Sequence, residues 1–218
     1  SRPIYFAVTT GPDAYIGLDK YFRLEGLAYR FVPIEYPDNR NPNVLGGFAS
    51  DKMYVLVMNQ FQWGGMDQTD KGGIYMDENN RRMSDNLRLQ FSNLAEQLIK
   101  EDKDKKGLDV LLKTIEVTPE ENVPYDKIML PIIESLYELS STDSLKTSAA
   151  LRSDLSNEDY AKSLEQANLV GDRLFTIFED EMRYYMSLSP AYFNQVSEDF
   201  RLMQTVNERI QQVAEFYQ

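Results

Sequence analysis

Aromatic and acidic side chains between residues 54 and 78 have the best potential for chemistry in this sequence. Trp63, with Tyr54 and Tyr75 nearby, could form a platform on which a sugar ring stacks. Asp77 and Glu78 would then supply paired carboxylates beside the sugar. The structural alternative is that Trp63 fills the seam between two lobes while the two acids begin a helix, whose dipole favours negative charge there. We favour this alternative, because no second motif accompanies the group and adjacent residues point in different directions.

The composition excludes several kinds of catalytic site. The chain has 218 residues and contains no Cys and no His. Ser-His-Asp and Cys-His nucleophile systems, zinc sites built on thiolate or imidazole, and disulfides are therefore impossible within it. Any catalyst would depend on carboxylates, Lys, Tyr or a hard metal. We predict no catalytic residue, no cofactor and no metal site.

The net charge of the chain indicates which partners are disfavoured. The 23 basic and 35 acidic residues give a net charge of −12, which repels nucleic acid and anionic lipid surfaces. No stretch approaches the ~20 apolar residues that cross a bilayer. The acidic run 179–181 and the loop around Asp38 could bind Ca²⁺, but both lack the alternating ligand spacing of a calcium loop. The four lysines between residues 100 and 106 are typical of a polar turn rather than an anion site.

The first 35 residues predict a strand-helix-strand unit. Residues 4–8 are continuously apolar, which favours a short strand buried on both faces. Asp13 could cap a helix that runs to about Leu24, with Ile16 on its inner side and Gly26 as its terminator. Residues 27–34 then favour a second strand.

The next segment contains a loop and one short helix. Residues 36–43 are turn formers with almost nothing to bury, so we expect an exposed loop. Asp51 begins the helix. Its inner face is expected to carry Tyr54, Val57, Met58 and Phe61.

Beyond residue 80 the pattern changes to paired helices. Residues 88–119 predict one antiparallel helix pair, in which five apolar residues are buried together: Phe91, Leu94, Leu98, Leu111 and Ile115. The spacing is similar to a tetratricopeptide repeat, including its terminal proline at Pro119. Small residues at Ala95 and Gly107 would let the two helices approach closely.

The remaining sequence predicts a second pair and a long hairpin. A stripe beginning at Met129 indicates one helix, and Leu145 and Ala149 indicate a weaker partner helix. Two helices near 28 residues each follow, joined by a turn in which Ser189 caps and Pro190 takes the first helical position. The predicted fold is mainly α, with a small α/β lobe at residues 1–80 and a tetratricopeptide-like helical region at residues 81–218.

Four sequence blocks carry a resemblance to a known family: residues 2–7, 17–33, 61–64 and 75–78. They look like the soluble C-terminal region of a large bacterial family of multi-pass membrane proteins of unknown function, which are similar to protein O-mannosyltransferases. The resemblance covers essentially the whole chain, and a folded element opens at Pro3 without an initiator Met. The resemblance implies that this chain is a periplasmic part of a longer inner-membrane protein. The catalytic acid of such transferases belongs to a loop of the membrane portion, so no catalytic residue carries over.

We consider three functional hypotheses, of which the resemblance implies the first. The first is a non-catalytic module that helps a membrane glycosyltransferase-like protein hold a protein acceptor, a glycan or a partner. The second is a carbohydrate-processing enzyme that uses carboxylates, and the third is a stand-alone helical scaffold. We expect any binding surface to lie at the seam between the lobes, to accept neutral or cationic ligands, and to use Trp63, Tyr75, Asp77 and Glu78.

Overall fold

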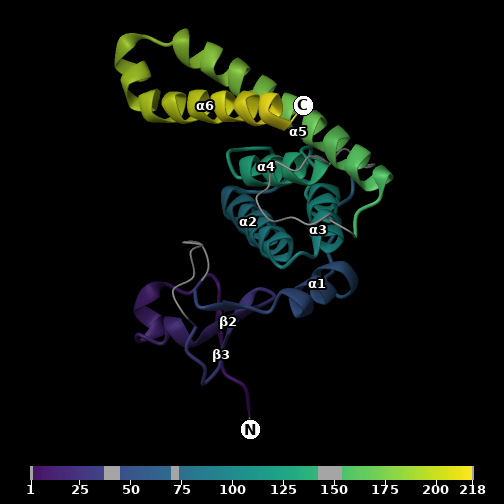
Figure 1. The fold of residues 1–218 in the computed structure, drawn as a ribbon. Coiled ribbons are helices and arrows are strands. Elements are labelled where there is room, and N and C mark those ends of the chain that lie inside the picture. The colour runs from purple at the N-terminus through teal and green to yellow at the C-terminus, as the bar shows by residue number, and fades with distance from the viewer. Residues whose placement is uncertain (1, 37–44, 70–73, 142–153, 218) are drawn as a thin grey trace.

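The computed structural model describes residues 2–36, 45–69, 74–141 and 154–217. The protein is mainly helical, with a small sheet at the N-terminal end and two long helices at the other end (Figure 1). The predicted fold class is thereby confirmed. The loop predicted at residues 37–43 and the weaker helix predicted around Leu145 and Ala149 lie outside the described residues.

The sheet contains β1 (Tyr5–Ala7), β2 (Phe22–Glu25), β3 (Ala28–Phe31) and β4 (Gly47–Phe48). Its strand order is β1-β3-β2-β4; β1 and β2 are antiparallel to β3, whereas β4 is parallel to β2. The turn between β2 and β3 places Gly26 at a φ of 72°, a conformation that glycine adopts without strain. Gly26 therefore closes a hairpin rather than a helix.

The helix predicted from Asp13 to Leu24 is wrong. The chain forms two short 3₁₀ turns, Pro12–Tyr15 and Asp19–Tyr21, and then enters β2. Ile16 and Gly17 both have positive φ, 54° and 71°, which interrupts any helix, and the Ile16 side chain is 81% exposed. The first strand is also not buried on both faces: Tyr5 and Ala7 are exposed and only Phe6 faces the core.

The inner face of the sheet is aromatic. The Phe22 and Tyr29 rings stack with centroids 5.6 Å apart, and Tyr15 meets Phe22 edge-on at 5.3 Å. Phe22 and Leu24 are fully buried. Alternate residues of a strand point to opposite faces, so this packing sends the other residues of β2 and β3 outward.

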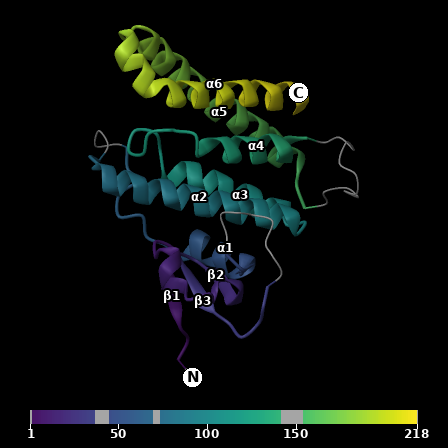
Figure 2. The same cartoon turned by 90° about the vertical axis from the view of Figure 1, so that its left-hand side faces the viewer.

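Helix α1 (Ser50–Asn59) connects the sheet to the helical region (Figure 2). Asp51 accepts hydrogen bonds from the Nζ atoms of Lys103 and Lys106, each at 2.7 Å, and the Tyr54 hydroxyl lies 3.1 Å from an Asp109 oxygen. The other two lysines of this run are also ion-paired, Lys100 with Glu96 and Lys105 with Asp159. These pairs agree with the interpretation of the lysines as a polar turn.

Helices α2 (Glu78–Lys100) and α3 (Asp104–Val117) form the predicted antiparallel pair. Leu94, Leu98 and Leu111 are fully buried and Phe91 nearly so, as predicted, while Ile115 is partly buried. A Cβ atom at Gly107 would lie 2.8 Å from Ile99 Cγ1 and 3.3 Å from the Ala95 carbonyl oxygen. The predicted close approach of the two helices therefore depends on this glycine.

Arg88, on α2, is the largest fully buried side chain of the described residues. Its guanidinium donates hydrogen bonds to the carbonyl oxygens of Thr118 and Pro124, both at 2.8 Å, and to that of Val123. Burial lowers the pKa of Arg88, and neighbouring charges such as Asp85 oppose the shift. This one cation holds the connection between α3 and α4 (Met129–Ser140) against α2.

The C-terminal hairpin consists of α5 (Asn157–Met186) and α6 (Pro190–Tyr217). Its helix lengths and the position of Pro190 confirm the sequence prediction. The base of the hairpin packs on α4, whereas its other end projects past α4 (Figure 1). Among the described residues, no helix is both long enough and apolar enough to span a membrane.

Candidate functional site

Trp63 lies at the seam between the sheet lobe and the helical region. Its ring meets Phe91 edge-on with centroids 5.8 Å apart, and it meets Phe61 at 6.0 Å. The indole is partly buried in this aromatic group. The structural interpretation of Trp63 as the residue that fills the seam is therefore supported.

The other three predicted binding residues lie on the approach to α2 and at its start. Tyr75 is 93% exposed. Asp77 is the N-cap of α2: its side chain accepts a hydrogen bond from the Asn80 backbone N–H at 2.8 Å. Glu78 is the first residue of the helix. The two acids thus have the helix-starting role expected for them.

Of these four residues, Glu78 lines a described cleft. The cleft, of about 370 Å³, lies between the first turns of α2 and residues 123–126. The lining carries both signs of charge: Glu78, Asp85 and Asp126 are acidic, and Arg81 and Arg82 are basic. Burial raises the pKa of Asp85, and the nearby Asp126 adds to the rise. Among the described residues, no cluster of three or more acidic side chains is placed to hold a metal ion.

A better defined polar group lies on the outer face of the sheet. Arg23 and Arg30 are direct partners across β2 and β3, and Tyr5 on β1 pairs with Arg30. These side chains share one face with Glu25, because residues paired across strands, and residues two apart along a strand, point the same way. Lys52 reaches the same carboxylate from α1.

The carboxylate of Glu25 organises this face. Its side chain is 1% exposed, and it accepts hydrogen bonds from Arg23 Nε at 2.9 Å, from the Tyr5 hydroxyl at 3.2 Å and from Lys52 Nζ. Arg30 Nη1 lies 3.5 Å from the same group. Burial alone would raise the pKa of Glu25, but hydrogen bonds from Lys52 and Arg23 lower it to about 2. The carboxylate is therefore ionised across the physiological range.

Tyr36 completes the face. Its ring lies against Gly47 of β4, where a Cβ atom would overlap the ring, and it interacts with Arg23. We name the six residues the sheet-face cluster: Tyr5, Arg23, Glu25, Arg30, Tyr36 and Lys52. Three cations surround one carboxylate, so the cluster carries a net charge of +2 on a chain of net charge −12.

The sheet-face cluster offers hydrogen-bond donors, aromatic rings and one ionised carboxylate to a ligand. The side chains of Arg23, Arg30 and Lys52 are 32%, 38% and 49% exposed, so each has donors that face solvent as well as Glu25. Two phenol rings lie beside them. Planar donors, aromatic faces and a fixed carboxylate together can hold a ligand rich in hydroxyl groups or a ligand that carries an anion.

Sequence reasoning missed the sheet-face cluster because it assigned most of β2 to a helix. One signal was present: residues 22–25 alternate between apolar and polar side chains, which is typical of a strand with one buried face. The sequence has no such signal for the ion pair of Lys52 with Glu25, because this pair depends on where α1 packs.

The protein is mainly helical, and its small N-terminal sheet carries a polar, cation-rich outer face. Residues 1–52 match the family model described as TMEM260-associated domain 2. This match relates the N-terminal quarter of the chain to TMEM260-like, O-mannosyltransferase-related proteins. No curated protein and no solved structure matches the chain. The matched segment contains every residue of the sheet-face cluster.

Proposed function

We propose that this chain is a non-catalytic, periplasmic module of a bacterial multi-pass membrane protein of the glycosyltransferase-like type, and that it binds a glycan on its sheet-face cluster. The observation that carries the proposal is the coincidence of two independent features. The segment related to an O-mannosyltransferase-like family is the segment that builds the polar face of the sheet. The module would hold a glycan, or the glycan of an acceptor protein, near the enzyme's membrane portion.

The chemistry of the cluster supports a glycan as the ligand. Sugar hydroxyls accept hydrogen bonds from guanidinium groups and can donate to a carboxylate, and the cluster offers both kinds of partner. Tyr5 and Tyr36 add flat surfaces that suit the apolar face of a sugar ring. The cluster is positively charged, although the whole chain is negatively charged. Glycans that carry carboxylates are therefore also suitable ligands.

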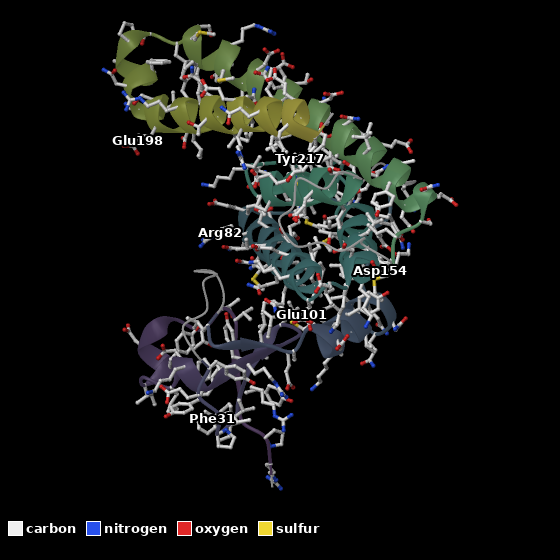
Figure 3. All side chains as sticks on the ribbon, viewed as in Figure 1. Phe31, Arg82, Glu101, Asp154, Glu198 and Tyr217 are labelled. Atoms are coloured by element: carbon white, nitrogen blue, oxygen red, sulfur yellow. The ribbon has the colours of Figure 1, made fainter. Side chains whose placement is uncertain are left out.

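Titration of the isotopically labelled chain with neutral and carboxylated oligosaccharides, followed by NMR, tests the proposal. We expect shifts at Tyr5, Arg30 and Tyr36. Arg30→Ala should weaken binding roughly tenfold, the effect of losing one hydrogen bond to a charged group. Arg82→Ala is the matched control, since Arg82 is exposed on α2 (Figure 3). Thermal unfolding of both variants separates lost binding from lost folding.

Two outcomes would overturn the proposal. Shifts confined to Trp63 and Tyr75 would place the ligand at the seam, as the sequence alone suggested. Equal affinities of the Arg30→Ala and Arg82→Ala variants would show that the sheet-face cluster is only a structural ion-pair group.

A further inference from the structure

The end of the α5–α6 hairpin is only partly buried, with Met182 and Tyr185 packed against the core. No residue between Phe178 and Met203 is buried, although both of these are. We name residues 179–202 the hairpin tip. It projects from the body of the protein, with Glu198 at its outer part and Tyr217 back at the base (Figure 3). A hairpin needs no extension of this length to pack on α4, so the extension requires another explanation.

The hairpin tip exposes large apolar side chains around its turn. Tyr184, Met186 and Tyr192 are each more than 60% exposed. Met186 also lines a shallow hollow of about 470 Å³, together with Leu188, Pro190, Phe193 and Asn194. Aromatic residues and Met are the types enriched in protein interfaces, and contiguous apolar patches with a polar rim mark interaction sites.

Acidic residues form a band behind this apolar end. Residues 179–181 on α5 are Glu, Asp and Glu, and residues 198 and 199 on α6 are Glu and Asp. Both groups lie about two helical turns from the connecting turn. The whole hairpin tip has five acidic and two basic residues, a net charge of −3, and contains no Lys. The band is therefore a mainly acidic rim beside an apolar surface, although Arg183 forms an exposed ion pair with Asp180 at 2.8 Å.

We propose that the hairpin tip is a docking surface for a basic amphipathic segment of a partner protein. An apolar stripe on the partner would cover Met186, Tyr192 and the hollow, while its Lys or Arg residues would face the acidic band. A second copy of this chain would bring two acidic bands together, and an anionic membrane would also be repelled. The tip lies at the opposite end of the molecule from the sheet-face cluster, so this inference does not depend on the glycan proposal (Figure 1).

The experiment uses a labelled synthetic peptide as the probe. The peptide contains only Leu and Lys, with Leu at helical i, i+3, i+4, i+7 spacing, and fluorescence anisotropy reports its binding to the whole chain. A peptide of the same composition with scrambled order tests whether amphipathicity matters. We expect the ordered peptide to bind, the scrambled peptide to bind at least about tenfold more weakly, and added salt to weaken both.

Two pairs of variants locate the surface. Glu198→Lys with Asp199→Lys should weaken binding roughly tenfold, whereas Glu208→Lys with Glu215→Lys, on the same helix and with the same change of charge, should not. Met186→Ser with Tyr192→Ser should also reduce binding, whereas Leu169→Ser, an equally exposed position on α5, should not. All these positions are exposed, so each variant is expected to fold; circular dichroism checks this.

Three results would overturn the proposal. In the first, the tip variants and their controls bind the peptide equally. In the second, the chain sediments as a dimer and the variant with Met186→Ser and Tyr192→Ser sediments as a monomer, which would make a second copy the occupant. In the third, the chain binds phosphatidylcholine vesicles and loses this binding in the same variant, which would make the tip a membrane anchor.

Discussion

Arg23 and Arg30 lie directly opposite each other on β2 and β3, and both guanidinium groups face the buried carboxylate of Glu25. Like charges that are direct cross-strand partners destabilise a sheet. Glu25, which also accepts a hydrogen bond from Lys52, offsets this repulsion. The strand pairing in the segment that matches the family model therefore depends on one acidic side chain.

Glu25→Gln should lower the free energy of unfolding by about 1–3 kcal/mol. The change leaves three cations without their common carboxylate, but the cations are partly exposed and water screens them. Urea denaturation followed by circular dichroism measures the loss. Glu35→Gln is the matched control, because Glu35 forms an exposed ion pair with Lys20 and should change stability by less than about 0.5 kcal/mol. Equal losses in the two variants would contradict this interpretation.

Stability should rise with pH between about 2 and 4. The pKa of Glu25 is about 2, and so are those of Asp51, lowered by hydrogen bonds from Lys103 and Lys106, and of Asp159, lowered mainly by Lys105. The corresponding pKa values in the unfolded chain are about 3.9–4.3, so the unfolded chain binds more protons in this range. This contribution is complete above the unfolded values and is lost as pH falls through 2. Urea midpoints measured at several pH values should show a smaller slope in Glu25→Gln, and an unchanged slope would count against the role of Glu25.

The sequence predicted the helical part of the fold well and the sheet poorly, for a physical reason. Helices such as α2 and α5 are long enough for the apolar positions to repeat several times, as from Phe91 to Leu98. The strands have two to four residues, so no period is established, and Asp13 and Gly26 resemble the cap and the terminator of a helix. The complete sheet-face cluster was beyond prediction because it combines a strand register with a lysine on another element.

Leu94→Ala should cost roughly 2–5 kcal/mol of unfolding free energy, the range for truncating a buried leucine. Leu94 is fully buried between α2 and α3 and belongs to the predicted helix pair. Leu169→Ala is a suitable control, because Leu169 lies on α5 with 62% of its surface exposed. Chemical denaturation of both variants tests the prediction, and a loss below 1 kcal/mol for Leu94→Ala would contradict the packing of this pair.

Arg88→Met should destabilise the protein by about 3–5 kcal/mol, although Met has a similar length and is apolar. The substitution leaves the carbonyl oxygens of the buried residues Thr118 and Val123, and that of the exposed Pro124, without the Arg88 donors. The connection between α3 and α4 should also become sensitive to limited proteolysis. Arg82→Met removes an exposed arginine from the same helix and should leave both measurements unchanged; if Arg88→Met behaves in the same way, the guanidinium is not what holds the connection.

The isolated chain should show no hydrolase or transferase turnover on a panel of glycosides. Asp77 is committed to capping α2 and Glu78 begins the same helix, so neither is placed as half of an acid/base pair. Within the described part of the chain, an enzyme is favoured by the cleft in which burial raises the pKa of Asp85 beside Asp126. Turnover that disappears in Asp85→Asn or Glu78→Gln would establish a carboxylate-based enzyme instead of a binding module. Asp77→Asn is the control for folding, because Asn caps a helix as well as Asp does and should preserve stability.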